Sequence, residues 1–240
     1  MAEEDDTWYD DTEHPALASF YESCEAGDLA ALKTLFHDHP DLDINALHNN
    51  PNHSEHRTPL HIAVIEGHRH IVGFLLALGA DLEVRSNPYE SFTALHWAAF
   101  NASPEMVRLL LDSGADLHAT FYAYEGDDGP VLFLPLYQIF PSSGRFPVEQ
   151  KHYDLLEIFL GLGLDINTPG SVCGQGSLIE RATRCDSPQL VKWLIDRGAK
   201  PTNDLISLAK VFHCSHIITY LVEDLGLRED DGESFAGSRT

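Results

Sequence analysis

One phrase occurs twice in this chain, and its spacing constrains the fold more than any local preference. The phrase is Thr-Pro-Leu-His-Ile-Ala at residues 58–63 and Thr-Ala-Leu-His-Trp-Ala at residues 93–98. A Gly-Ala-Asp-Leu string follows each copy, at residues 79–82 and 114–117. Both elements recur after 35 residues. Self-similarity at a period of about 33 residues indicates a repeat array, so the chain is predicted to stack similar units in a row.

Weaker copies of the pattern extend the array in both directions. With the threonine position as an anchor, six copies start at Ala18, Thr58, Thr93, Leu134, Ser177 and Asp204. Five of them are followed by apolar residues with the spacing i, i+1, i+4, i+5, as at Met106, Val107, Leu110 and Leu111. This spacing places them on one face of a helix. A helix pair this short cannot bury such a face alone, so neighbouring units are expected to pack together.

The pattern resembles the ankyrin repeat, in which a Thr-Pro-Leu-His-x-Ala opening, two short helices and a Gly-Ala-Asp ending follow one another. Two copies match strongly and four are degenerate, which suits capping units at the ends. The resemblance implies an all-α ankyrin-repeat solenoid of helix-turn-helix units with hairpin-loop fingers over residues 16–228. Residues 141–152 depart from it and are expected to form an insertion between the two helices of the fourth repeat.

The charge of the chain limits the classes of partner that it can bind. The sequence has 38 acidic and 15 basic residues, for a formal net charge of −23. Such a surface repels phosphate, which argues against nucleic acid and favours a basic segment of a protein partner. Acidic residues also crowd the two ends, where we expect a disordered tail over residues 1–15 and a second acidic tail over residues 229–240.

Cysteine usage and hydropathy indicate the compartment. The four cysteines are widely spread and form no Cys-x-x-Cys motif, and the Met-Ala-Glu-Glu-Asp-Asp start is unlike a basic signal-peptide region. We therefore expect a cytoplasmic or nuclear protein with reduced thiols. No apolar run approaches the ~18 residues that cross a bilayer, so no membrane association is expected. Nothing indicates a two-fold interface, so a monomer is the expected state.

Histidines are the first candidates for chemistry, because the chain has 14 of them. The resemblance implies a structural role for His61 and His96, which bond to the backbone and to the nearby threonine in that family. His48, His53, His56, His68 and His70 crowd the start of the second repeat. A metal site would need further ligands at fixed geometry, which this spacing does not demand. We expect a solvated loop there, with neither a metal nor a cofactor.

The concave groove of the solenoid is the predicted binding surface. In this architecture the residue before each anchor and those four, seven and eight after it face the groove. The predicted binding residues are Phe92, Trp97, Phe100, Asn101, Phe133, Gln138, Arg181 and Arg184, with Tyr89 at a hairpin tip. Aromatic residues and arginine are favoured interface anchors. The alternative for Trp97 and Phe133 is that they pack against the neighbouring inner helix.

Two functions follow from this groove. The first is a non-catalytic protein–protein interaction module that binds its partner through the groove and the hairpin tips. The alternative is a cofactor-free enzyme or binder of a small apolar ligand, with isomerase-type or cyclase-type chemistry in repeats 3–5. Its acid–base groups would be Tyr137, Glu180, Arg181 and Arg184, the first two replacing the histidine of the phrase. That replacement is equally compatible with a rewired hydrogen bond between repeats.

Overall fold

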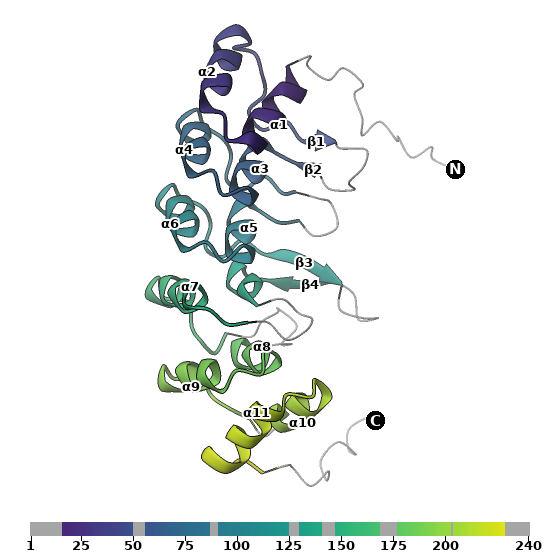
Figure 1. Cartoon of the computed structure of the whole chain (residues 1–240), viewed down its shortest axis with the longest axis vertical. Helices are drawn as coiled ribbons and strands as arrows, with labels where there is room; N and C mark the ends of the chain where they lie inside the picture. The colour runs from purple at the N-terminus through teal and green to yellow at the C-terminus, as the bar shows by residue number, and fades with distance from the viewer. Residues whose placement is uncertain are drawn as a thin grey trace, which may run out of the picture.

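The computed structural model describes residues 16–49, 56–86, 91–124, 130–140, 147–168, 177–202 and 204–228. These residues are mostly helical, and their helices stack in two columns (Figure 1). The inner column holds α1 (Leu17–Ala26), α3 (Pro59–Ile65), α5 (Ala94–Phe100), the 3-10 helix η2 (Pro135–Ile139), α8 (Leu178–Arg184) and α10 (Asp204–Val211). The outer helices are α2 (Leu29–Asp38), α4 (Arg69–Ala77), α6 (Pro104–Asp112), α7 (Gln150–Gly161), α9 (Pro188–Asp196) and α11 (Ser215–Thr219), which continues into η3 (Tyr220–Asp224).

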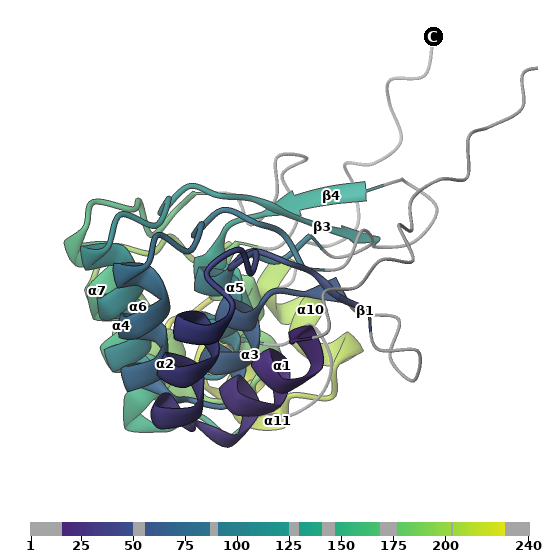
Figure 2. The ribbon, with the colours of Figure 1, turned by 90° about the horizontal axis from the view of Figure 1, so that it is seen from above.

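Hairpin loops connect successive helix pairs and project to one side of the two helical layers (Figure 2). β1 (His48–Asn49) pairs with β2 (His56–Arg57), and β3 (Phe121–Tyr124) pairs with β4 (Pro130–Phe133), both antiparallel. The expected all-α repeat solenoid with hairpin fingers is therefore confirmed. None of the described helices is long and apolar enough to span a membrane.

The threonine and histidine of the repeated phrase start the inner helices. The backbone N–H of Thr58 donates to Nδ1 of His61 over 3.1 Å, and the Thr58 hydroxyl accepts from the His61 backbone N–H. The Thr93 backbone N–H donates to Nδ1 of His96, again over 3.1 Å. These bonds satisfy amides that the first helical turn leaves free. The structural role expected for both histidines is confirmed.

In five units a left-handed residue turns the chain from the inner helix to the outer helix. It lies nine positions after the anchor, at Gly27, Gly67, Ala102, Asp186 and His213, with φ between 47° and 77°. The regular spacing shows that the degenerate units keep the same turn. Where the turn residue is not glycine, the backbone adopts a conformation that side chains disfavour.

Polar side chains join each unit to the next along the base of the fingers. The Asn45 side-chain oxygen accepts from the Asp81 backbone N–H over 2.9 Å, and Asn167 accepts from the Lys200 backbone N–H over 3.0 Å. At the end of the second unit, a Glu83 carboxylate oxygen accepts from the backbone N–H of Asp116 in the third unit. Each acceptor lies two residues after an aspartate that orders its own turn. The Asp-x-Asn sequence pattern therefore serves as a rung between repeats.

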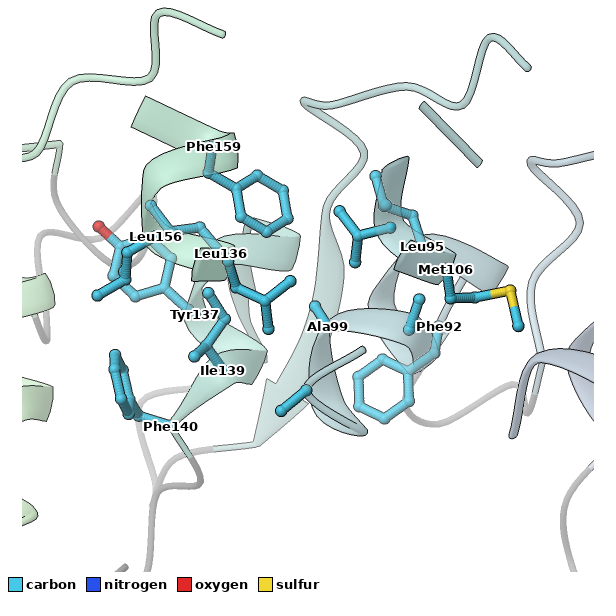
Figure 3. Packing of buried hydrophobic residues seen from close by; sticks show 14 of the residues in the cluster. Phe92, Leu95, Ala99, Met106, Leu136, Tyr137, Ile139, Phe140, Leu156 and Phe159 are labelled. Carbon is cyan, nitrogen blue, oxygen red and sulfur yellow. The ribbon is translucent and has the colours of Figure 1, made fainter. Parts of the chain in front are cut away.

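The hydrophobic core is continuous along the stack. Leu95 and Met106 of the third unit and Leu136, Leu156 and Phe159 of the fourth are fully buried on the two sides of one unit boundary (Figure 3). Burial of one such side chain stabilises the fold by about 1.5–3 kcal/mol. Because each unit buries its apolar face against its neighbours, the stack depends on all of its boundaries.

The fourth unit departs from the pattern of the others. Its inner helix η2 is a five-residue 3-10 helix, whereas α3, α5 and α8 each have seven residues. Its outer helix α7 begins at Gln150, so residues 150–152 are helical although they fall in the expected insertion. The reason is local, since Nδ1 of His152 accepts from the Glu149 backbone N–H over 2.8 Å, as in the two strong repeats. Residues 141–146 lie outside the described residues.

Candidate interaction groove

The last residues of the inner helices form a row along the solenoid. Ile65, Phe100, Arg184 and Val211 end α3, α5, α8 and α10, and each lies seven positions after its anchor. Phe100 is 49% exposed and Val211 is 71% exposed. Ile65 and Arg184 are half-buried. The row thus presents one side chain per unit, and two of them are large exposed apolar groups.

Trp97 anchors an aromatic cluster beside Phe100. The edge of one ring faces the other with 5.9 Å between centroids, and the Arg57 guanidinium lies 4.8 Å from the centre of the indole. Trp97 is half-buried, and its Nε1–H donates to the Ser86 hydroxyl over 2.8 Å. The hydrogen bond and the cation–π contact hold the indole in place. Phe100 is therefore exposed on a fixed aromatic base.

Phe92 does not belong to this exposed surface. Only 8% of Phe92 is accessible, because its ring packs 4.8 Å from Phe121 of β3 and 5.3 Å from Trp97. Its burial removes it from the residues that can contact a partner. Tyr89 and the Phe133 side chain lie outside the described residues.

Two predicted polar residues lie near the middle of the stack. Asn101 is exposed, but its side-chain amide donates to the Ile65 carbonyl oxygen over 3.0 Å. That carbonyl belongs to the last turn of α3, where helical acceptors are otherwise free. Gln138 is half-buried in η2. Asn101 therefore ties the second unit to the third.

Arg181 is a structural residue. It is 5% exposed, and its Nη1 donates to the carbonyl oxygens of Tyr137 over 3.3 Å and of Phe140 over 3.1 Å. η2 ends at Ile139, and Arg181 supplies a donor to carbonyl oxygens in and just after its last turn. The guanidinium also lies 5.6 Å from the centre of the Tyr137 ring. Arg181 is thus internal and does not face a partner.

Arg184 differs from Arg181, although the two lie on the same helix. Its guanidinium lies 4.8 Å from the centre of the Phe212 ring, one residue after the exposed Val211. Its Nε is buried and donates to no acceptor among the described residues. Within the described part of the chain, no carboxylate forms an ion pair with it either.

Comparison with known families bears on the repeated units. Residues 20–120 match the family model for ankyrin repeats, with three copies. The chain contains ankyrin repeats. A segment of 74 residues is also 38% identical to the palmitoyltransferase AKR1 of Saccharomyces cerevisiae. That segment covers 31% of this chain and only 9% of the yeast protein, so the similarity is limited to one short stretch of each protein.

Helix pairs beyond residue 120 continue the ankyrin stack. η2 packs against α5, α7 against α6 and α10 against α8, and Arg181 reaches back from α8 to the fourth unit. The four unit-terminal residues of the row therefore span both the region that matches the family model and the region beyond it.

The two residues that replace the histidine of the ankyrin phrase are hydrogen-bonded within the array. The Tyr137 hydroxyl donates to the Thr168 carbonyl oxygen over 2.5 Å, and burial raises the pKa of that phenol. A Glu180 carboxylate oxygen accepts from the Ser177 backbone N–H over 3.0 Å and so forms a capping box at the start of α8. These contacts favour the rewired hydrogen bond over the acid–base interpretation.

Charge is unevenly distributed along the ankyrin array. Residues 16–176 include 21 acidic and 7 basic residues, whereas residues 177–228 include 6 acidic and 7 basic residues. The acidic character of the chain therefore belongs to the first four units and the tails. No group of three or more potential metal ligands occurs among the described residues.

Val211 and Arg57 are surface residues that the predicted set omitted. Val211 is the most exposed large apolar side chain in the described chain, and Arg57 supports Trp97 from the preceding unit. Both lie at groove positions of the register, before the anchor for Arg57 and seven after it for Val211. The register alone marks both positions.

Proposed function

We propose that this protein is a non-catalytic protein–protein interaction module with an ankyrin array over residues 16–228. Its partner binds in the concave groove and against the hairpin tips. The observation that carries the proposal is the 49% exposure of Phe100 on the Trp97–Arg57 base. An exposed aromatic ring held by fixed neighbours gains apolar contact on binding and loses little side-chain entropy.

The rigidity of the groove supports this function. Rungs such as Asn45 to Asp81 and Asn167 to Lys200 fix each unit relative to the next. Asn101 adds a further link between α3 and its own unit. A surface that is already ordered in the free protein pays less for binding than a loop that must fold around its ligand.

The charge of the first four units supports a basic segment in the partner. Their 21 acidic and 7 basic residues create a negative field along the part of the groove that includes Phe100. Such a field speeds the encounter with a cationic segment and disfavours nucleic acid. In this proposal the field selects the partner, and the aromatic cluster supplies most of the affinity.

The enzymatic alternative has weaker support. It requires acid–base groups that are free in the groove, whereas Tyr137 and Glu180 are hydrogen-bonded to Thr168 and Ser177. Arg181 is buried on two carbonyl oxygens of the fourth unit. Three of the four acid–base candidates are therefore engaged inside the array, so the interaction module is preferred.

We further propose that the module acts as a monomer in the cytoplasm or nucleus. Cys24, Cys185 and Cys214 are buried free thiols in the described chain. Burial raises the pKa of Cys24 to about 12 and that of Cys185 to about 11, so both are protonated and poorly reactive. Reduced, inert thiols suit a reducing compartment.

Partner capture with matched variants tests the proposed function. Partners would be crosslinked to the full chain in cells, identified by mass spectrometry and then measured by calorimetry with purified protein. The substitution Phe100→Ala is expected to weaken binding by about tenfold or more. Leu78→Ala is the control, because Leu78 is 47% exposed but ends the outer helix α4. An unchanged Kd for a folded Phe100→Ala protein would reject the proposed surface.

A further inference from the structure

Among the described residues of this strongly acidic protein, Arg184 has no carboxylate partner. Its Nε is buried without an acceptor among the described residues, and no described carboxylate neutralises its charge. Buried polar groups without partners are uncommon in folded proteins. Leaving such a donor unsatisfied costs about 1–3 kcal/mol, and nothing among the described residues offsets that cost.

The surroundings of Arg184 are apolar. The Phe212 ring lies 4.8 Å from the guanidinium carbon, and Val211 beside it is 71% exposed. Leu208, one turn earlier on α10, is half-buried and packs against the core. The aromatic face orients the flat guanidinium, and the exposed valine offers a contact for an aliphatic side chain. A ligand for this place therefore combines an anion with an apolar group.

The local charge favours a monoanion. Residues 177–228 have 6 acidic and 7 basic residues, so they lack the excess of negative charge found in the earlier units. Sites for phosphorylated segments use clusters of arginines, but here the neighbouring Arg181 is buried on backbone carbonyls. One guanidinium that can form two parallel hydrogen bonds matches a single carboxylate.

We propose that Arg184, Phe212 and Val211 form a subsite for an acidic side chain within an apolar segment of the protein partner. The carboxylate pairs with Arg184, and a neighbouring aliphatic side chain covers Val211. This inference rests on the proposed function, and it assigns opposite charges to two parts of the partner. The basic part lies over the acidic early units, and the acidic part lies over the last two.

Short peptides test the subsite directly. The full chain, labelled on valine methyls and arginine Nε, would be titrated with acetyl-Leu-Glu-Leu-amide and with acetyl-Leu-Gln-Leu-amide and followed by NMR. The glutamate peptide is expected to shift the Arg184 Nε and Val211 methyl signals and to bind about five-fold more tightly than the glutamine peptide. Equal shifts of Val211 by both peptides would overturn the proposal.

Variants establish that Arg184 is the cause. R184Q is expected to abolish the preference for glutamate, and R197Q is expected to keep it. Arg197 is a suitable control because its guanidinium also lies over an aromatic ring, 3.6 Å from the centre of Trp193, but it is paired with Glu157 on the outer helices. A preference for glutamate that persists in R184Q would reject the assignment.

Two further peptides separate other anions from the proposed one. Acetyl-Leu-phosphoserine-Leu-amide and acetyl-Leu-Gln-Leu with a free carboxyl terminus should bind no more tightly than the glutamate peptide. Tighter binding of either peptide would show that the subsite selects a phosphate or a chain terminus, not a side-chain carboxylate. These results are independent of the Phe100→Ala capture experiment, so the subsite can fail while the interaction function stands, and the reverse.

Discussion

Arg181 donates a hydrogen bond to the carbonyl oxygen of Phe140 across the boundary between the fourth and fifth units, over 3.1 Å. The same nitrogen donates to Tyr137, so one buried side chain closes the end of the shortened helix η2. An arginine predicted to face a partner thus compensates for an irregularity inside the stack. Arg181 thus holds the fifth unit against the fourth, whose inner helix η2 has only five residues.

Arg181→Met should therefore destabilise the protein. Methionine keeps much of the volume but leaves two buried carbonyls without their donor, which is expected to cost about 2–4 kcal/mol. Urea unfolding followed by circular dichroism measures the change. Lys192→Gln, an exposed substitution on α9, is the control and should alter the stability by less than about 0.5 kcal/mol. Comparable losses for both variants would contradict the capping role of Arg181.

Stability should fall as the pH drops through the range in which exposed histidines titrate. Burial lowers the pKa of His61 to about 4 and that of His96 to about 3. In the unfolded chain both titrate near 6.5 and take up protons first, so folding is favoured fully above about pH 6.5 and progressively less below it. For each histidine, the free energy of unfolding is expected to fall by about 2 kcal/mol between pH 7 and pH 5.

Urea unfolding at the two pH values measures this loss, and a variant identifies its origin. His96→Gln keeps a side chain that can accept from the Thr93 backbone N–H but cannot be protonated. It should be less stable than the parent at pH 7 and should lose less stability on acidification. A variant with the same pH dependence as the parent would assign the effect to other groups, such as the many carboxylates.

Two glycines at equivalent turns should respond differently to alanine. Gly67 has a φ of 77° and no atom within 4 Å of an added Cβ, so Gly67→Ala should cost only the backbone strain, about 1 kcal/mol. Gly27 has a φ of 70°, but an added Cβ would lie 2.8 Å from the His68 ring. Gly27→Ala should therefore be clearly worse in thermal unfolding. The opposite order would refute the steric assignment.

The side chains of Asn45 and Asn167 should stabilise the array according to the number of hydrogen bonds that each makes. Asn167 accepts from the Lys200 backbone N–H and donates to the Gly198 carbonyl oxygen, whereas within the described residues the Asn45 side chain makes one such bond, from the Asp81 backbone N–H. Asn167→Ala should thus cost more than Asn45→Ala, with about 1 kcal/mol for each bond. Hydrogen exchange at the Lys200 and Asp81 amides measures each loss locally. Protection unchanged in both variants would show that the rungs are dispensable.

Much of the fold could be predicted from the sequence because the repeated phrase carries its own hydrogen bonds. His61 and His96 were predicted to be structural, and the threonine contacts account for that role. The register also selects Phe100 and Arg184, which are the last residues of their inner helices. A pattern with a local physical mechanism transfers from unit to unit, even where the sequence is degenerate.

The failures arise from contacts between segments far apart in the sequence. Phe92 occupies a groove position in the register, but Phe121 of the next hairpin covers it. Arg181 is buried because η2 ends early, which no local pattern near Arg181 indicates. Glu180 is different, since the Ser-x-x-Glu spacing from Ser177 already predicts a capping box. Only this last role could have been found in the sequence.

The row of helix ends from Ile65 to Val211 limits how a bound partner segment can slide along the solenoid. Its members are chemically unlike, with an aliphatic, an aromatic, a cationic and a second aliphatic side chain in that order. A bound segment that slipped by one unit would move its charged group from Arg184 to Val211, and a slip of two units would place its apolar group on Arg184 or its charged group on Phe100. The backbone of the stack has translational symmetry, but the side chains of the row break it. Only one alignment of the partner is therefore favoured.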